Sequence, residues 1–131
     1  MGTSGFRNFD NDDAADFLAD FADDPSEVLL LEALITAAEE EGDLDADVAA
    51  QALAAAEIVA AWQGQPAPDF PEDLRELADE LDVSDEDELT ELARRAVASV
   101  VNRSELLELW KASNELPQWQ QTQQDLLKRL E

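Results

Sequence analysis

An alanine-rich segment in the middle of the chain constrains the fold more than any other feature. Residues 50–62 read AQALAAAEIVAAW. Alanine has the highest intrinsic helix propensity, because its methyl group loses no rotamer freedom when a helix forms. A helix of this composition also carries little side-chain bulk, so its neighbours can approach its backbone closely. We therefore predict a helix from about Ala46 to Gln63, ended by Gly64, with close helix–helix packing around it.

Apolar residues at helical spacing recur on both sides of this segment. We expect a first helix over residues 14–24, with Asp10 or Asn11 as its N-cap, and a second over residues 25–41, ended by Gly42. The second helix is apolar over much of its circumference, so we expect it to be well buried. Later helices are expected to start at Pro71, after a Ser84 cap and after Pro117, while residues 102–104 fit either a kink or a new helix. A capping-box-like pair is expected at Asp24 and Glu27.

These patterns predict one all-α domain over residues 1–131, a compact bundle of about six or seven helices. Its 131 residues are enough for one core and too few to divide into two domains. Residues 1–9 carry two glycines and two phenylalanines without helical spacing, and we expect them to form an extended arm. A net charge of -25 favours disorder, but the 45% apolar content at helical spacing favours folding.

The charge excludes several classes of partner. The chain has 33 acidic and 8 basic residues, and such a surface repels the phosphates of nucleic acids and of anionic membranes. No apolar run reaches the roughly 18 residues needed to span a bilayer, and no signal segment is seen at the N-terminus. We expect a cytoplasmic protein that binds neither nucleic acid nor membrane, whose charged partner is a basic protein or a cation.

The residue types argue against catalysis. Histidine, cysteine and tyrosine are absent, which removes the commonest general bases, nucleophiles and soft metal ligands. No phosphate-binding glycine loop, nucleophile elbow or metalloprotease motif occurs. We expect neither an enzyme nor a bound cofactor.

An aspartate cluster near the N-terminus is the candidate charged site. Asp10, Asp12, Asp13 and Asp16 have the oxygen ligands and spacing that a calcium or magnesium ion accepts, although the glycine and final glutamate of an EF-hand are missing. Asp12, Asp16 and Asp20 share one helical face and are candidate residues for binding a basic partner. The alternative is that these aspartates cap and solvate the first helix.

The aromatic residues divide into two groups. Phe6 and Phe9 lie in the arm, either as an anchor folded back onto the core or as a segment that a partner recognises. Trp62, Trp110 and Trp119 lie on or beside apolar stripes, and we expect them to pack in the core, with a binding groove as the alternative.

Two segments resemble a known family. The opening Met1-Gly2-Thr3-Ser4-Gly5, with residues 9–18 (FDNDDAADFL), resembles the start of a bacterial family termed domain of unknown function 4259, and the likeness continues through the alanine-rich segment to residues 104–110 (SELLELW). Members commonly have tryptophan at the position of Ser4 and a glycine near Arg7, so the arm departs from the pattern. The resemblance implies a small bacterial all-helical protein and supplies no reaction, cofactor or catalytic residue.

Three hypotheses for function follow. The first is a non-enzymatic protein that acts by contact, as a regulatory, adaptor or immunity-type binder whose acidic face meets a basic partner. The second is binding of a divalent cation at the aspartate cluster. The third is that the acidity only adapts the surface to a saline solvent.

Overall fold

Seven helices make up the bundle seen in the computed structural model, which describes residues 8–9, 12–40, 42–67 and 70–130. They are α1 (Asp12–Asp23), α2 (Glu27–Glu39), α3 (Ala46–Trp62), α4 (Glu72–Asp79), α5 (Glu86–Asn102), α6 (Glu105–Lys111) and α7 (Leu116–Arg129). No strand occurs in this part of the chain, where the only ladder contact is an isolated parallel bridge between Leu44 and Ser104. The predicted all-α bundle is confirmed. The predicted arm lies mostly outside the described residues, which hold only Asn8 and Phe9 of it.

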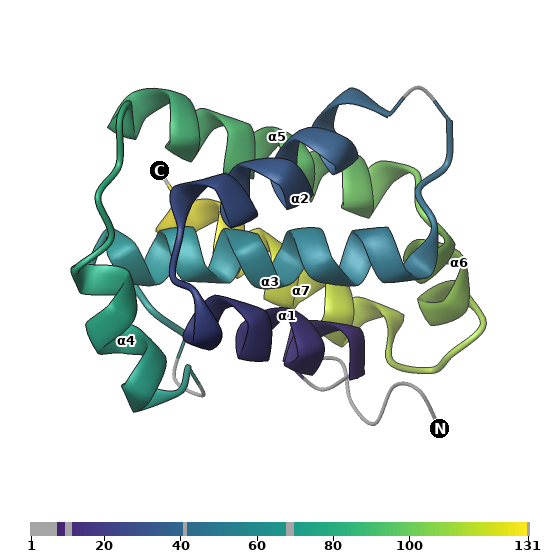
Figure 1. Ribbon diagram of the computed structural model, residues 1–131. Coiled ribbons are helices and arrows are strands. Elements are labelled where there is room, and N and C mark those ends of the chain that lie inside the picture. The colour runs from purple at the N-terminus through teal and green to yellow at the C-terminus, as the bar shows by residue number, and fades with distance from the viewer. Residues whose placement is uncertain (1–7, 10–11, 41, 68–69, 131) are drawn as a thin grey trace.

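The alanine-rich helix α3 is the centre of the bundle (Figure 1). It contacts every other helix, with α2 and α5 on one side, α1 on another, α7 behind and the short helices α4 and α6 towards its two ends. Every residue from Ala52 to Ala61 is buried. The small alanine side chains leave room for neighbours all round, as the sequence predicts. Gly64 follows the helix with a φ of 89°, a left-handed conformation that glycine adopts without a steric penalty.

The helix α2 is less buried than its sequence predicts. Leu30, Leu34 and Ala37 enter the core, but Val28 and Ile35 remain 60% and 40% exposed. Only one side of α2 meets α3 and α5, so the apolar residues on its outer side have no cover among the described residues. The expectation of a well-buried second helix is therefore wrong.

Three predicted cap and stop signals are also wrong. The N-cap of α2 is Ser26, whose Oγ accepts a hydrogen bond from the amide of Val28, while Glu27 accepts from the hydroxyl of Ser84 at 3.1 Å and from its amide at 3.2 Å. Asp85 caps α5 in place of Ser84, because its side chain accepts from the amide of Glu88 at 3.1 Å. The helix α2 ends at Glu39, three residues before Gly42, since the backbone of Glu40 is already extended, with φ -68° and ψ 129°. The carbonyl of Gly42 accepts a hydrogen bond from Arg103.

A new helix starts after residues 102–104, which settles the ambiguity there. The backbone leaves helical geometry at Arg103, with φ -158° and ψ 81°. Ser104 then caps α6 by accepting from the amide of Leu107, and its hydroxyl donates to the carbonyl of Val100. Leu44 pairs with this junction through both of its backbone groups. The segment before α3 therefore holds the turn between α5 and α6.

Candidate functional site

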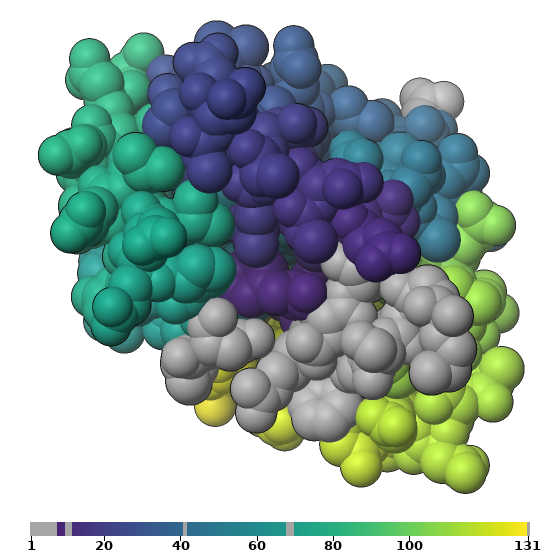
Figure 2. All heavy atoms as spheres, turned by 60° about the horizontal axis from the view of Figure 1, so that its bottom comes forward, coloured from purple at the N-terminus to yellow at the C-terminus, as the bar shows by residue number. Residues whose placement is uncertain are grey.

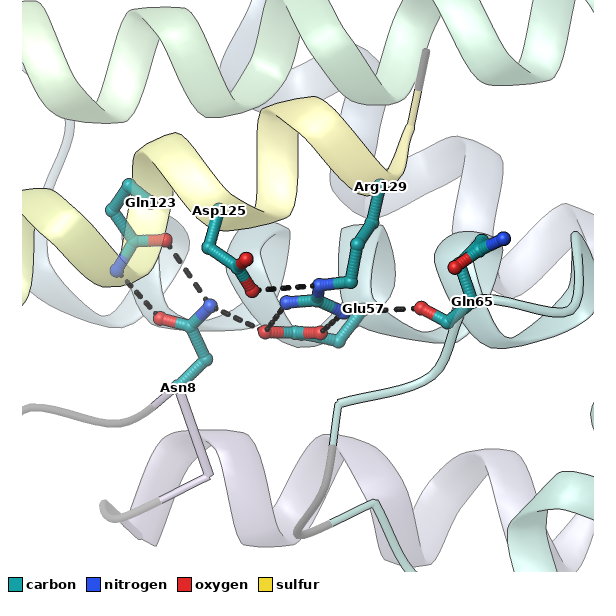
Figure 3. Close-up of polar contacts among 6 residues, drawn as sticks. All are labelled: Asn8, Glu57, Gln65, Gln123, Asp125 and Arg129. Atoms are coloured by element: carbon teal, nitrogen blue, oxygen red, sulfur yellow. Dashed lines mark hydrogen bonds and ion pairs between the residues drawn. The ribbon is translucent and has the colours of Figure 1, made fainter.

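A buried carboxylate interrupts the apolar surface of α3. Glu57 is 2% exposed, and a buried charge is costly unless it is paired and hydrogen-bonded. Arg129 at the end of α7 supplies the pair: its two terminal nitrogens lie 2.8 Å from Oε1 and 3.3 Å from Oε2 of Glu57 (Figure 3). The two-pronged contact fixes the position of α7 along α3, since a guanidinium meets a carboxylate in one plane.

Two amides complete the cluster around Glu57. Asn8 donates from Nδ2 to Oε2 of Glu57 at 2.8 Å and to Oε1 of Gln123 at 3.1 Å. Gln123 returns a hydrogen bond from Nε2 to Oδ1 of Asn8 at 2.7 Å. Figure 3 shows the amide pair beside the ion pair, with the N-terminal segment, α3 and α7 each contributing. The cluster thus joins the two ends of the chain to the central helix.

Arg129 has two further partners at the rim of the cluster. Its Nε donates to Oδ2 of Asp125 at 2.9 Å, and one terminal nitrogen donates to the carbonyl of Gln65 at 3.2 Å. Burial by itself lowers the pKa of the Arg129 guanidinium, but the hydrogen bonds and charges of Glu57 and then Asp125 outweigh it and raise the pKa above its ordinary value. The surroundings of Arg129 in the folded protein therefore favour its charged form.

The polar groups of the cluster around Glu57 are paired with one another, as in a structural contact. Both oxygens of Glu57 accept hydrogen bonds, and no buried side-chain nitrogen or oxygen in the described part of the chain lacks a partner. A general acid or base must instead reach a substrate proton. Sequence reasoning did not single out these four residues. The available signals were a lone glutamate among alanines at position 57 and a glutamine on the apolar face of the last helix at position 123.

The aspartates predicted to form a charged site lie along the outer side of α1. Asp12, Asp16 and Asp20 are exposed and Asp13 is half-buried, while Asp10 lies outside the described residues. Across the described ranges, no three carboxylates approach closely enough to hold a metal ion. Figure 2 shows α1 (purple) crossing this face of the molecule beside α4 (teal green). The aspartates therefore form an open row on the surface.

The two phenylalanines of the arm are placed differently. Phe6 lies outside the described residues. Phe9 is half-buried and meets Phe70 edge to face, with ring centroids 5.6 Å apart and an interplanar angle of 63°. Such a pair adds stabilisation beyond its buried area. Phe9 therefore packs against the core as an anchor. Trp119 and Trp110 also pack in the core, where they are 1% and 8% exposed.

A hollow beside α1 brings two of the predicted aspartates together. Asp16 and Asp20 line it with Glu32 of α2, above a floor that includes Leu29 and Val48, and its volume is about 260 Å³. We name this hollow the α1–α2 hollow. Three carboxylates around an apolar floor favour a ligand with cationic groups and some apolar surface.

A second and larger hollow lies on the other side of α2. It runs between α2 and α5, has a volume of about 390 Å³, and is floored by Leu31, Ile35, Leu89 and Leu92. We name it the α2–α5 groove. Its polar lining is Glu27, Glu39, Ser84, Asp85, Glu88, Glu91 and Arg95. The sequence did not predict this groove, because it depends on how two separate helices pack.

The sequence matches one family model over nearly its whole length. That family, described as domain of unknown function (DUF4259), is matched over residues 2–122. No curated protein matches significantly, and no solved structure does.

Proposed function

The chain belongs to the DUF4259 family. We propose that it is a non-enzymatic protein-binding module of a regulatory, adaptor or immunity type. In this proposal its acidic surface binds a basic protein in the cytoplasm. The observation that carries the proposal is the α1–α2 hollow, where Asp16, Asp20 and Glu32 surround an apolar floor. This surface offers a partner both charge and apolar contact. Electrostatic attraction would steer a basic protein to it and speed association.

The balance of charges supports the same proposal. Against 33 acidic residues, the described residues form three ion pairs, and two of these share Arg129. Most carboxylates of the described residues are therefore left without a cationic partner in this part of the chain. None of the described helices is long and apolar enough to cross a membrane, and the same carboxylates repel nucleic acid.

The absence of enzyme activity is part of the proposal. The residue types that most often act as bases or nucleophiles are missing from the sequence, and the buried carboxylate Glu57 is held by Arg129 and Asn8. Neither a serine–histidine nor a cysteine–histidine pair can form, because the sequence contains no histidine and no cysteine. Binding without chemistry is what such a surface supports.

A pull-down from the native host tests the proposal. The bait is the whole protein, at low and at high sodium chloride, compared with the double variant Asp16→Lys/Asp20→Lys and with Asp73→Lys/Asp79→Lys, which changes the charge equally on exposed positions of α4. We expect a basic protein that is recovered at low salt, is retained by the α4 variant and is lost by the α1 variant. Recovery of no basic protein, or equal loss with both variants, overturns the proposal.

The other two explanations of the acidity give different results. Calorimetric titration with calcium and with magnesium, on the protein and on Asp12→Asn and Asp16→Asn, detects a discrete cation site as stoichiometric heat that the variants abolish. Adaptation to a saline solvent predicts salt-dependent stability with no cation stoichiometry and no selective partner.

A further inference from the structure

The outer side of α2 carries an apolar stripe whose two ends are exposed and whose middle leucine is half-buried. Val28, Leu31 and Ile35 are spaced i, i+3 and i+7, so they lie on one side of the helix. Val28 is 60% exposed and Ile35 is 40% exposed, and they are two of the three large exposed hydrophobic residues in the described structure, the other being Leu109 at 57%. Val28 and Ile35 lie two turns apart on the same side of the helix, with the half-buried Leu31 between them, and a contiguous apolar surface of this kind is a feature of interaction sites.

The stripe continues into the α2–α5 groove. Leu31 and Ile35 form the α2 wall of the groove, and Leu89 and Leu92 of α5 form the opposite part of its floor. Two helices packed side by side present a groove that receives the side-chain ridge of a third helix. From Val28 to Ile35 the stripe covers seven residue steps, about 10 Å, which matches two turns of such a helix. Anchors at i, i+3 or i+4 and i+7 are the usual way in which a helix fills an apolar groove.

The rim of the groove determines the charge of its occupant. Five carboxylates line the groove, and they face one guanidinium, that of Arg95. Ion pairs among the described residues involve none of these six side chains. A segment with lysines or arginines flanking its apolar anchors would neutralise this rim, whereas an acidic or neutral segment would leave it unpaired.

The same charges rule out the obvious alternative, a second copy of this chain. Each copy carries a net charge of -25 and the same acidic rim, so a symmetric dimer through this groove would place carboxylates against carboxylates. An anionic lipid surface is repelled for the same reason. A basic amphipathic helix from another protein satisfies both the apolar floor and the acidic rim.

We propose that the α2–α5 groove is the docking site for a basic amphipathic helix of the partner protein. This inference rests on the proposed function and goes beyond it, because it gives the partner a second contact surface, across α2 from the α1–α2 hollow, and states what kind of segment docks there. Leu31 and Ile35 of the groove supply the apolar contacts, and the exposed Val28 extends them towards the start of α2. The carboxylates of the rim orient the helix and select for positive charge.

Fluorescence anisotropy with two labelled synthetic peptides tests the docking site. One peptide is helical, with leucines at i, i+3, i+4 and i+7 and lysines at its other positions, and the second has the same composition scrambled to remove the apolar stripe. We expect the whole protein at physiological salt to bind the amphipathic peptide at least about tenfold more tightly than the scrambled peptide. Equal binding of the two peptides, or binding of neither, overturns the inference.

Serine variants of exposed hydrophobic residues locate the contact. Val28→Ser and Ile35→Ser are each expected to weaken binding of the amphipathic peptide by about tenfold or more, the loss typical of a well-placed interface anchor. Leu109→Ser, an equally exposed position on α6, is the matched control and should leave affinity unchanged. All three positions are exposed, so thermal melts should show that the variants fold normally. Unchanged affinity in both α2 variants overturns the inference.

The groove proposal and the protein-binding proposal can fail independently of each other. A basic native partner that Val28→Ser/Ile35→Ser retains as well as the unmodified protein does would overturn the groove proposal and leave the protein-binding proposal standing. Recovery of no basic protein from the host would overturn the proposed function, whatever the peptide measurements show.

Discussion

Asn8 and Gln123 exchange two amide hydrogen bonds across 115 residues of chain, one of 3.1 Å from Asn8 to Gln123 and one of 2.7 Å in return. Both side chains are buried, and Asn8 also donates to Glu57. A single side chain of the N-terminal segment thus contacts the central helix and the last helix at once. We expect the start of the chain to stabilise the whole bundle through this contact.

Changing Asn8 tests that role. Asn8→Ala removes a donor from Glu57 and two hydrogen bonds from Gln123, and leaving buried polar groups unpaired costs about 1 to 3 kcal/mol. Asn8→Asp is nearly isosteric but replaces the donor, 2.8 Å from the Glu57 carboxylate, with a second carboxylate, so we expect a larger loss at neutral pH. Urea unfolding at neutral pH measures both effects. Equal stability of Asn8→Asp and the unmodified protein would show that this contact does not form in solution.

The ion pair between Arg129 and Glu57 gives a second prediction. Arg129→Leu leaves a buried carboxylate without its charge partner and is expected to cost about 3 to 5 kcal/mol in unfolding free energy. Glu57→Leu/Arg129→Leu removes both charges and should cost less than Arg129→Leu alone. Asp125 is the control: its side chain is 57% exposed, so Asp125→Ala should change stability by under about 1 kcal/mol. A double variant less stable than Arg129→Leu contradicts the prediction.

The raised pKa of Arg129 predicts insensitivity to alkaline pH. A group whose pKa is higher in the folded state stabilises the protein fully below its unfolded pKa and loses this contribution as pH rises through the folded pKa. For arginine both values lie above about 12, so the contribution of Arg129 is constant from about pH 7 to 11. Arg129→Lys places a group with an ordinary pKa of about 10.4 at this position. We expect its stability to fall above about pH 10, in urea titrations where the unmodified protein is flat.

The sequence predicts the helices better than it predicts what joins them. The spacing of Phe17 and Phe21, or of Leu89 and Leu92, depends on one helix only, and these residues are buried as expected. The predicted cap at Ser84 is wrong because the next residue, Asp85, accepts from the Glu88 amide, while Ser84 bonds to Glu27, 57 residues away. The contacts of Glu57 cross 49 and 72 positions, so no local pattern reports them. The same reason hides the α2–α5 groove, whose walls come from two separate helices.

Two glycines should respond oppositely to alanine. Gly64 has a φ of 89°, and no atom lies within 4 Å of the point that a Cβ would occupy, so Gly64→Ala meets only backbone strain and is expected to cost about 1 to 2 kcal/mol. Gly42 has no positive φ, and an added methyl group would lie 3.9 Å from Glu40. Gly42→Ala should therefore stabilise by about 0.4 to 1 kcal/mol, by restricting the unfolded chain. Thermal melts of the two variants compare them directly, and a stabilising Gly64→Ala would contradict the assigned conformation.

Added sodium chloride should raise the melting temperature. Repulsion among carboxylates on one small surface is stronger in the folded chain than in the expanded one, so it opposes folding. Asp12, Asp16 and Asp20 illustrate it, since like charges four residues apart destabilise a helix. Salt shortens the range of this repulsion from about 10 Å at 0.1 M to about 3 Å at 1 M, whereas the pair of Glu57 and Arg129 is buried and screened less.

The variant Asp16→Asn/Asp20→Asn distinguishes repulsion from a general effect of salt on stability. With two charges fewer, it should melt at a higher temperature than the unmodified protein at low salt and should gain less on addition of sodium chloride. The two melting curves should therefore converge as the salt concentration rises. A melting temperature that is flat or falls with salt would mean that the carboxylates are already paired or well dispersed. That result would count against saline adaptation, and it would also weaken the case for a basic partner, because both require an unneutralised acidic surface.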